Sequence, residues 1–145
     1  MDTLTVLLVD DAKVVRERLV EMLAEVPAIG AIHQAWSVRS ALELIRLTEP
    51  EIVVLDIHLP DPENRSSSTN GIDVLLKIKE QRSREGGLPK VIMLTNLTYP
   101  QYRRLCVRYG ADFFLDKSSD FEKLPEVITE LAGEILEDRS PSHPA

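Results

Sequence analysis

Cysteine, histidine and long apolar runs are all scarce in this chain. A single cysteine, Cys106, excludes an internal disulfide and suits a reducing compartment. No apolar run approaches the roughly 18 residues that a membrane span needs. The N-terminus also lacks the basic segment that opens a signal peptide. We therefore expect a cytoplasmic protein that makes no membrane contact.

Basic residues are in deficit as well. The 145 residues include 17 Lys and Arg against 24 Asp and Glu, and the formal net charge is −7. Binding to nucleic-acid phosphates needs a cationic surface, which this composition does not supply. We expect no direct binding of nucleic acid by this chain.

Apolar residues make up 43% of the chain, which is enough for one domain with a full core. Strand-like and helix-like segments alternate five times. This (βα)5 pattern predicts a doubly wound α/β fold, a five-stranded parallel sheet with helices on both faces. We expect the domain to cover residues 1–137. Residues 138–145 hold two prolines and no core residue, and predict a flexible C-terminal tail.

Several local features add detail to this outline. Ser37 is expected to cap the second helix, and Gly71 to precede the third. The second strand, near residues 31–36, is less apolar than the others and is expected near a sheet edge, with Trp36 partly buried. Cys106 shares a helical stripe with apolar residues, which predicts core packing rather than reactivity.

Polar side chains follow four of the predicted strands at the point where each strand ends. In a parallel sheet these ends lie along one edge, and ligands bind there, where the winding reverses. The apolar runs and their polar neighbours are Val6–Val9 with Asp10 and Asp11, Ile52–Leu55 with Asp56, Val91–Leu94 with Thr95, and Phe113–Leu115 with Lys117. The sequence therefore predicts one site built from distant parts of the chain.

Three carboxylates at one edge of a sheet repel one another. Two charges about 4 Å apart cost on the order of 4 kcal/mol at an effective dielectric of about 20. Lys117 offsets one charge, and the remainder favours a divalent cation. Oxygen ligands without a cysteine or histidine cluster favour Mg²⁺ over Zn²⁺. Mg²⁺ readily shares a phosphate oxygen, so we infer phosphoryl chemistry. A carboxylate would form an acyl phosphate, with Lys117 and Thr95 stabilising the phosphoryl group.

Each of these residues, taken singly, has an ordinary structural explanation. Asp11 could simply cap the helix that begins near Ala12. Thr95 alone is an ordinary strand-end hydroxyl, and Lys117 alone an ordinary surface lysine. The functional interpretation depends on finding all of them together at matching strand ends.

In this order and spacing, the motifs resemble the receiver domain of two-component response regulators. The resemblance covers residues 4 to 137 and implies a flavodoxin-like strand order of 2-1-3-4-5. It also implies that Asp56 accepts a phosphoryl group from a histidine kinase or a histidine phosphotransfer protein. The matching segments are Leu7–Asp11, Val53–Pro60, Gly71, Val91–Thr95 and Phe114–Lys117.

The same resemblance assigns roles to the remaining site residues. It implies that Mg²⁺ is held by Asp10, Asp11, Asp56 and the backbone carbonyl of His58. Thr95 and Lys117 would sense the phosphoryl group. Phe114 falls at the aromatic switch position of the family and would swing inward when Thr95 moves.

Four features depart from the family pattern. Asn96 stands where a small residue is usual, so Asn96, Leu97 and His58 are expected to modulate access of small-molecule donors. Ser118 replaces the proline that usually follows the lysine, which makes a cis bond there improbable. Phe114 lacks a tyrosine hydroxyl and would act by packing alone. The loop Leu59–Asn70 is about seven residues longer than the family's norm, a long βα connection that could gate access or contact a partner.

We expect a signalling switch rather than a metabolic enzyme. In the family the output surface is the fourth helix, fifth strand and fifth helix, here near Pro100–Tyr109 and Leu124–Ile135. We expect a protein output partner of unknown identity there, because no DNA-binding segment follows residue 137. A homodimer that forms through the same face is a further possibility.

Three alternatives remain. An aspartyl-nucleophile phosphohydrolase would usually carry a second acid where His58 stands. A binding module with a vestigial phosphorylation site would not need the full set of polar residues. A flavin-binding protein of this topology would need a phosphate-cradling loop after the first strand, where Asp10 and Asp11 would repel the phosphate.

Overall fold

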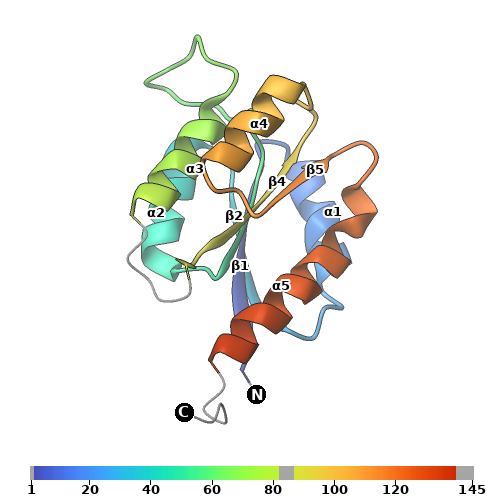
Figure 1. Cartoon of the computed structure of the whole chain (residues 1–145). Coiled ribbons are helices and arrows are strands. Elements are labelled where there is room, and N and C mark those ends of the chain that lie inside the picture. The colour runs from blue at the N-terminus through green and yellow to red at the C-terminus, as the bar shows by residue number, and fades with distance from the viewer. Residues whose placement is uncertain (1, 82–86, 140–145) are drawn as a thin grey trace.

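A five-stranded parallel sheet forms the centre of the molecule (Figure 1). The computed structural model describes residues 2–81 and 87–139. The strand order is β2-β1-β3-β4-β5, which confirms the predicted fold and its order 2-1-3-4-5. The strands are β1 Leu4–Val9, β2 Ile29–Ala35, β3 Ile52–Leu55, β4 Lys90–Thr95 and β5 Phe113–Asp116.

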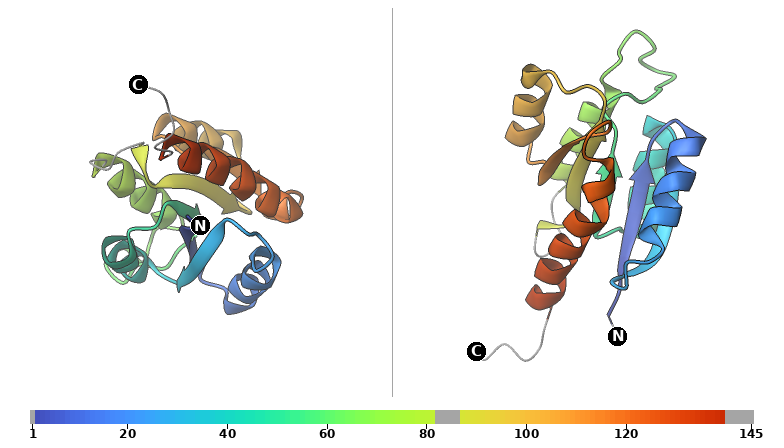
Figure 2. Two further views of the ribbon diagram at one scale, coloured as in Figure 1. Left: turned by 90° about the horizontal axis from the view of Figure 1, so that it is seen from below. Right: turned by 90° about the vertical axis from the view of Figure 1, so that its right-hand side faces the viewer.

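Helices cover both faces of this sheet (Figure 2). Side chains of α1 and α5 pack in one core cluster, and those of α2, α3 and α4 pack in the other. The helices are α1 Lys13–Leu23, α2 Val38–Thr48, α3 Asn70–Glu80, α4 Pro100–Arg108 and α5 Leu124–Asp138, with a 3-10 turn η2 at Phe121–Lys123 before α5. None of the helices in the described ranges is long and apolar enough to cross a membrane.

The alternation of side chains along β1 explains how one strand serves both core clusters. Val6 and Leu8 pack with α1 and α5, whereas Leu7 and Val9 face the opposite helices. All four are buried, as expected for a central strand with helices on both sides. Strand β1 pairs with β2 on one side and with β3 on the other, which fixes the ends of β1 and β3 side by side.

Local sequence signals account for several element boundaries. Ser37 caps α2 as predicted: its Oγ accepts from the Ser40 N–H at 3.1 Å, and the Ser40 Oγ accepts from the Ser37 N–H at 3.0 Å. Strand β2 lies at the sheet edge, as its weaker apolar character indicates. Gly110 has a φ of 96° just after α4, a left-handed conformation that glycine adopts without strain.

Three local predictions are wrong, and the alternative role of Asp11 as a helix cap is not observed. Asp11 does not cap α1, because the N–H of Ala12 bonds to Asp10 Oδ1 instead, at 2.9 Å. Gly71 lies inside the first turn of α3 rather than before it. Trp36 is 54% exposed, because it follows the edge strand β2. The last helix continues to Asp138, one residue into the predicted tail, and residues 140–145 lie outside the described part of the chain.

Candidate functional site

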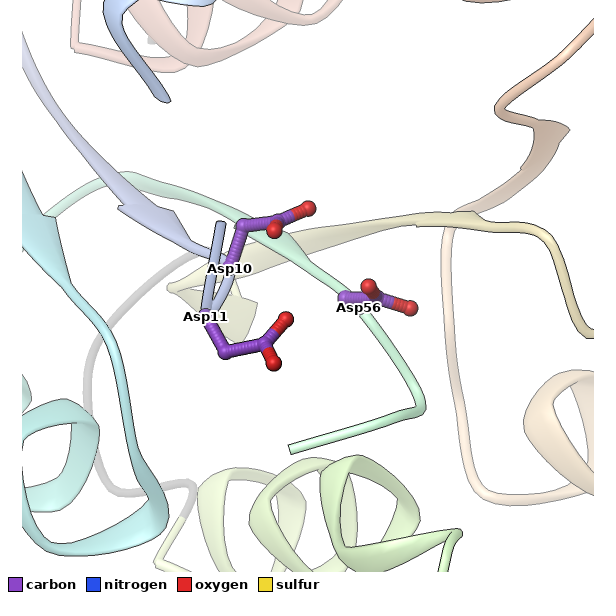
Figure 3. A group of neighbouring side chains, drawn as sticks. All are labelled: Asp10, Asp11 and Asp56. Carbon is purple, nitrogen blue, oxygen red and sulfur yellow. The ribbon is translucent and has the colours of Figure 1, made fainter. Parts of the chain in front are cut away.

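Asp10, Asp11 and Asp56 turn their carboxylates into one space at the end of the sheet (Figure 3). Asp10 follows β1 directly and Asp56 follows β3, the strand that pairs with β1. One oxygen from each of the three lies within 4.8 Å of the others. Asp10 and Asp56 are buried, whereas Asp11 is exposed. The predicted acid cluster is therefore present as a spatial group.

Lys117 reaches this group from the end of β5. Its Nζ donates to Asp10 Oδ2 at 2.6 Å and to Asp56 Oδ2 at 2.7 Å. Burial alone would lower the pKa of the Lys117 ammonium, but the hydrogen bonds to Asp10 and Asp56 outweigh it, and the pKa is held above its usual value. The ammonium is therefore charged at neutral pH and offsets part of the carboxylate repulsion.

Backbone groups hold the other oxygens of the two buried carboxylates. Asp10 Oδ1 accepts from Ala12, and Asp56 Oδ1 accepts from the His58 N–H at 3.2 Å. In the described part of the chain, the Asp11 carboxylate has no hydrogen-bond or ion-pair partner. Two acids are thus fixed in orientation, and the third is free to bind.

Thr95 is the last residue of β4 and is fully buried beside these strand ends. Its Oγ1 accepts a hydrogen bond from the Leu97 N–H at 3.1 Å. The residue therefore fastens the start of the loop that leads to α4. Asn96 is exposed on this loop and Leu97 is half-buried.

Arg16 is a site residue that the sequence reasoning missed. Its side chain is 9% exposed, its Nη1 donates to the backbone carbonyl of Asp10 at 2.7 Å, and its Nε donates to Gln34 Oε1 at 3.1 Å. The guanidinium also lies 5.9 Å from the Trp36 ring centre. Helical spacing could have indicated that Arg16 is buried, because it stands three residues before the buried Leu19 and lies on the same face of α1.

Gly71 lets α3 approach the turn that carries Asp56. A Cβ at this position would overlap the backbone carbonyl oxygen of Asp56 and would lie 2.7 Å from the Cα of Ile57. The Gly71 N–H also donates to the Ile57 carbonyl at 2.7 Å. Glycine is required here by close approach of two backbones, so this part of the resemblance has a steric cause.

The long loop Leu59–Asn70 projects from the same end of the sheet (Figures 1 and 2). Asn70 closes it, because its Nδ2 donates to the carbonyls of Leu59, Asn64 and Ser67 at 2.8, 3.4 and 3.3 Å. A cavity of about 350 Å³ lies between this loop and Asp11. His58 also lines the cavity, and its Nδ1 lies 3.2 Å from the Ser68 carbonyl oxygen.

Phe114 lies on β5, one strand away from Thr95, and is half-buried against the α2–α4 side of the core. The Arg103 guanidinium of α4 lies 4.8 Å from its ring centre. The aromatic ring is therefore covered by a cation from the neighbouring helix.

The peptide bond between Lys117 and Ser118 is trans, as expected. Among the described residues, the cis peptide bond is the one between Leu88 and Pro89.

The donor set fits Mg²⁺ better than Zn²⁺. The acid cluster offers carboxylate oxygens alone, and no cysteine or histidine ring among the described residues joins it. Asp10 and Asp56 each direct one oxygen at Lys117, so a cation would share these acids with the ammonium. Three acids and one ammonium leave the site with excess negative charge, so uptake of a phosphoryl group would need a bound divalent cation as well.

Comparison with known proteins gives a consistent match. The family model described as the response regulator receiver domain matches residues 6–129. An uncharacterized response regulatory protein of Vibrio cholerae is 31% identical over 128 residues, covering 88% of this chain and 48% of that protein. A protein-glutamate methylesterase/protein-glutamine glutaminase of Desulfotalea psychrophila is 35% identical over 98 residues, covering 68% of this chain and 24% of that protein.

Solved structures agree with the sequence matches. A LuxR-family two-component response regulator from an Aurantimonas species superposes with a TM-score of 0.74 at 28% identity, covering 91% of this chain and 87% of that one. A CheY-like receiver domain from Methanospirillum hungatei shows the same fold, with a TM-score of 0.78 at 23% identity over 94% of this chain and 99% of that one. The chain spans 48% of the length of the Vibrio cholerae protein and 24% of the length of the Desulfotalea psychrophila protein. By its fold, its motifs and these matches, the chain belongs to the response regulator receiver domain family.

Proposed function

We propose that Asp56 is the phosphoryl acceptor of a phosphorylation-dependent switch, in keeping with the general role of receiver domains. The observation that carries the proposal is the contact of one ammonium, Lys117 Nζ, with both Asp10 and Asp56 at 2.6 and 2.7 Å, beside the third acid. A buried carboxylate held by a cation and a backbone N–H is oriented for attack, and phosphoryl transfer relies mainly on positioning and charge stabilisation.

The proposed reaction uses a phosphohistidine of a histidine kinase or a histidine phosphotransfer protein. An oxygen of Asp56 attacks the phosphorus, an O–P bond forms, and the P–N bond to the donor imidazole breaks with its electron pair leaving on the imidazole. Lys117 pairs with the charge of the transferred group. The Thr95 hydroxyl, whose oxygen accepts from the Leu97 N–H, still has its own proton to donate to one phosphoryl oxygen.

Asp10, Asp11, Asp56 and the backbone carbonyl of His58 would hold Mg²⁺. When bound, the ion would neutralise charge on the phosphoryl oxygens. The exposed Asp11 carboxylate, which has no partner in the described chain, is the ligand most available to it. Asn96, Leu97 and His58 would modulate access, because Asn96 and His58 are exposed and all three adjoin the strand ends.

The phosphohydrolase alternative is not favoured. Such an enzyme needs a general acid close to the nucleophile, and His58 instead has its ring at the Ser68 carbonyl oxygen. Only the backbone N–H of His58 reaches the Asp56 carboxylate. The switch remains the better proposal, with a cytoplasmic location and a protein output partner.

Phosphotransfer to wild type, Asp56→Ala and Asp61→Asn tests the proposal. A phosphorylated histidine phosphotransfer protein with Mg²⁺ should label wild type and Asp61→Asn equally, because Asp61 lies on the loop outside the acid cluster. Asp56→Ala should take up no acid-stable, base-labile phosphate. Labelling that survives in Asp56→Ala would overturn the assignment, and beryllofluoride binding checks the same site without a protein donor.

A further inference from the structure

Asn70 carries a buried oxygen atom that no group in the described part of the chain satisfies. The residue is 1% exposed, and its side-chain Oδ1 accepts no hydrogen bond from any described residue. A buried carbonyl oxygen without a donor is costly, and in native proteins such an atom commonly marks a bound water or ion. The position of Asn70 at the base of the long loop therefore points to a ligand there.

The nitrogen of the same amide fixes which way it faces. Nδ2 lies 2.8, 3.4 and 3.3 Å from the backbone carbonyls of Leu59, Asn64 and Ser67. Turning the amide over would place Oδ1 against these three oxygens, so Oδ1 is the atom left without a donor. Nδ2 also has only two hydrogens for the three carbonyls. The interior of the loop thus holds more oxygen acceptors than donors.

Asn70 lines the cavity of about 350 Å³ between the loop Leu59–Asn70 and Asp11. Asp61 lines it too, so two carboxylates face one permanent cation, the exposed Arg65. Asp61 Oδ1 accepts from the Glu63 N–H at 2.9 Å. The other Asp61 carboxylate oxygen has no hydrogen-bond or ion-pair partner among the described residues. A second unpaired oxygen therefore borders the same space.

This lining selects a cation over an anion. An anion would meet the carboxylates of Asp11 and Asp61. The dipole of α3, which begins at Asn70, opposes a cation with only about half a charge. The first free N–H groups of that helix, at Gly71 and Ile72, are already bonded to backbone carbonyls. The two carboxylates therefore dominate the local charge.

Among cations, the donor set and its support favour Ca²⁺. Calcium takes carboxylate oxygens, amide and backbone carbonyl oxygens and water in an irregular arrangement. Magnesium requires a near-octahedral set of ligands, which a regular strand end supplies more readily than an irregular loop. A carboxylate, an amide carbonyl and surplus backbone carbonyls are the ligands that this loop offers.

We propose that this cavity is a calcium site, with Asn70 Oδ1 and the Asp61 carboxylate as protein ligands and water completing the coordination. Neither residue belongs to the acid cluster of Asp10, Asp11 and Asp56. The loop site is thus a second cation site, and it goes beyond the proposed function because it requires no phosphorylation.

Asp11 borders both cation sites, since it belongs to the acid cluster and also lines the loop cavity. Two divalent cations on either side of one carboxylate repel each other and compete for its charge. Calcium in the loop should therefore weaken Mg²⁺ binding at the acid cluster several-fold, and Mg²⁺ should weaken Ca²⁺ binding by the same factor. This coupling, unlike the loop site itself, rests on the proposed function.

Calorimetric titration with Ca²⁺ in excess Mg²⁺ tests for the loop site. Magnesium occupies the acid cluster under these conditions, and one calcium should still bind per chain. Asp56→Ala, which damages the acid cluster, should retain this calcium. A calcium signal that disappears in Asp56→Ala would place the ion in the acid cluster and overturn the inference.

Two variants with equal charge change locate the ion. Asp61→Asn keeps an oxygen for the Glu63 N–H and removes the charge, and it should weaken Ca²⁺ binding about tenfold. Glu63→Gln removes the same charge from the same loop, but Glu63 is exposed, does not line the cavity and faces Arg39 at 3.9 Å. Its calcium affinity should equal that of wild type. Arg65→Gln should tighten binding a few-fold.

Substitutions at Asn70 give a readout that does not depend on affinity. Asn70→Asp places a carboxylate against the loop carbonyls, so its melting temperature should fall in chelator and recover when Ca²⁺ is added. Asn70→Ala should also melt earlier, because the loop loses its donor, but Ca²⁺ should not restore it. Equal recovery of the two variants would contradict the role of the Asn70 oxygen.

Three further results would overturn the inference. These are no calcium bound in excess Mg²⁺, equal calcium affinity of Asp61→Asn and Glu63→Gln, or full occupation of the loop site by Mg²⁺ alone. The first would leave Asn70 Oδ1 to a water molecule. Failure of phosphotransfer to Asp56 would contradict the proposed function and leave the calcium site standing, because the two are measured separately.

Discussion

The Arg16 guanidinium and the backbone carbonyl of Asp10 are joined by a buried hydrogen bond of 2.7 Å. This bond ties the first helix to the turn that carries two of the three clustered acids. A buried cation normally pairs with a carboxylate, but the Arg16 guanidinium contacts a backbone carbonyl, a side-chain amide and an indole ring.

Replacing Arg16 should therefore destabilise the fold. Arg16→Met leaves the Asp10 carbonyl and the Gln34 amide without their donor, and we expect a loss of about 2–3 kcal/mol in the free energy of unfolding. Urea denaturation measures it. Arg18→Met is the matched control on the same helix, since Arg18 is exposed and its guanidinium lies over the Phe121 ring, and this variant should lose less than about 1 kcal/mol. Equal losses would contradict the assigned role.

Two glycine-to-alanine changes should have opposite effects. Gly71→Ala forces a methyl group into the backbone of Asp56 and Ile57 and should destabilise by about 3 kcal/mol. Gly133→Ala, within α5, meets nothing within 4 Å and should stabilise by about 0.5–1 kcal/mol, because alanine favours helix. Thermal and urea unfolding check both. A neutral Gly71→Ala would mean that the turn bearing Asp56 yields easily.

Magnesium should stabilise the wild type and not the Asp11→Asn variant. Asp11 is exposed without a partner in the described chain, so the change should leave the metal-free melting temperature nearly unaltered. Excess Mg²⁺ should raise the wild-type melting temperature by mass action, by RT ln(1 + [Mg²⁺]/Kd) in free energy. A thermal-shift titration with Ca²⁺ and K⁺ as controls measures it. An identical response in Asp11→Asn would exclude this acid as a ligand.

Acidic pH should remove the contribution of Glu51 to stability. This residue precedes β3, at the opposite end of the sheet from the acid cluster. Burial alone would raise the pKa of Glu51, but its bonds to Arg139 at 2.9 Å and to the Thr5 N–H at 2.7 Å hold that pKa below its usual value. A lowered pKa stabilises the fold above the unfolded-state value of about 4.3 and loses this effect as pH falls through the folded value.

The Glu51→Gln variant isolates this contribution. It should be less stable than wild type by about 1 kcal/mol at pH 7, because an amide pairs less strongly with Arg139. The difference should shrink below about pH 4 as Glu51 is protonated. Glu43→Gln, on an exposed helix position, should match wild type throughout. A difference that does not depend on pH would show that packing, not charge, decides the effect.

Cys106 should resist thiol reagents in the folded protein. The side chain is fully buried, and burial raises the pKa of its thiol to about 11. Both access and thiolate fraction are therefore low near pH 8. Labelling with Ellman's reagent should be slow in buffer and rapid in denaturing urea. Fast labelling without denaturant would indicate that α4 opens readily from the sheet.

The strand ends were predictable because two simple rules coincide there. Runs of buried apolar residues such as Ile52–Leu55 identify central strands, and the polar residue that follows each run must lie at the sheet edge. The positions of Asp10, Asp56 and Thr95 follow from this alone, and Lys117 stands one residue further, directly after β5. Asp10 and Asp56 meet because β1 and β3 are neighbouring strands, whereas Lys117, at the end of β5 beyond β4, reaches both of them with its long side chain.

Features set by tertiary contacts were harder to predict. An arginine such as Arg16 resembles a solvated helix residue until the carbonyl above it is known. Asp11 was a plausible helix cap, but Asp10 Oδ1 is already placed to accept the same kind of bond from Ala12. Trp36 is exposed because it follows an edge strand, and the sequence pattern does not define what covers that edge.

Asn70 determines where the loop Leu59–Asn70 should tolerate an insertion. Its amide fastens the loop at Leu59, Asn64 and Ser67, so the loop's two ends are joined independently of its tip. Arg65 and Ser66 are exposed and lie between the fastened residues Asn64 and Ser67, so an insertion between them should not be transmitted to the Asp56 turn. The tip is therefore a natural place to graft a fluorophore or an affinity tag within reach of the acid cluster.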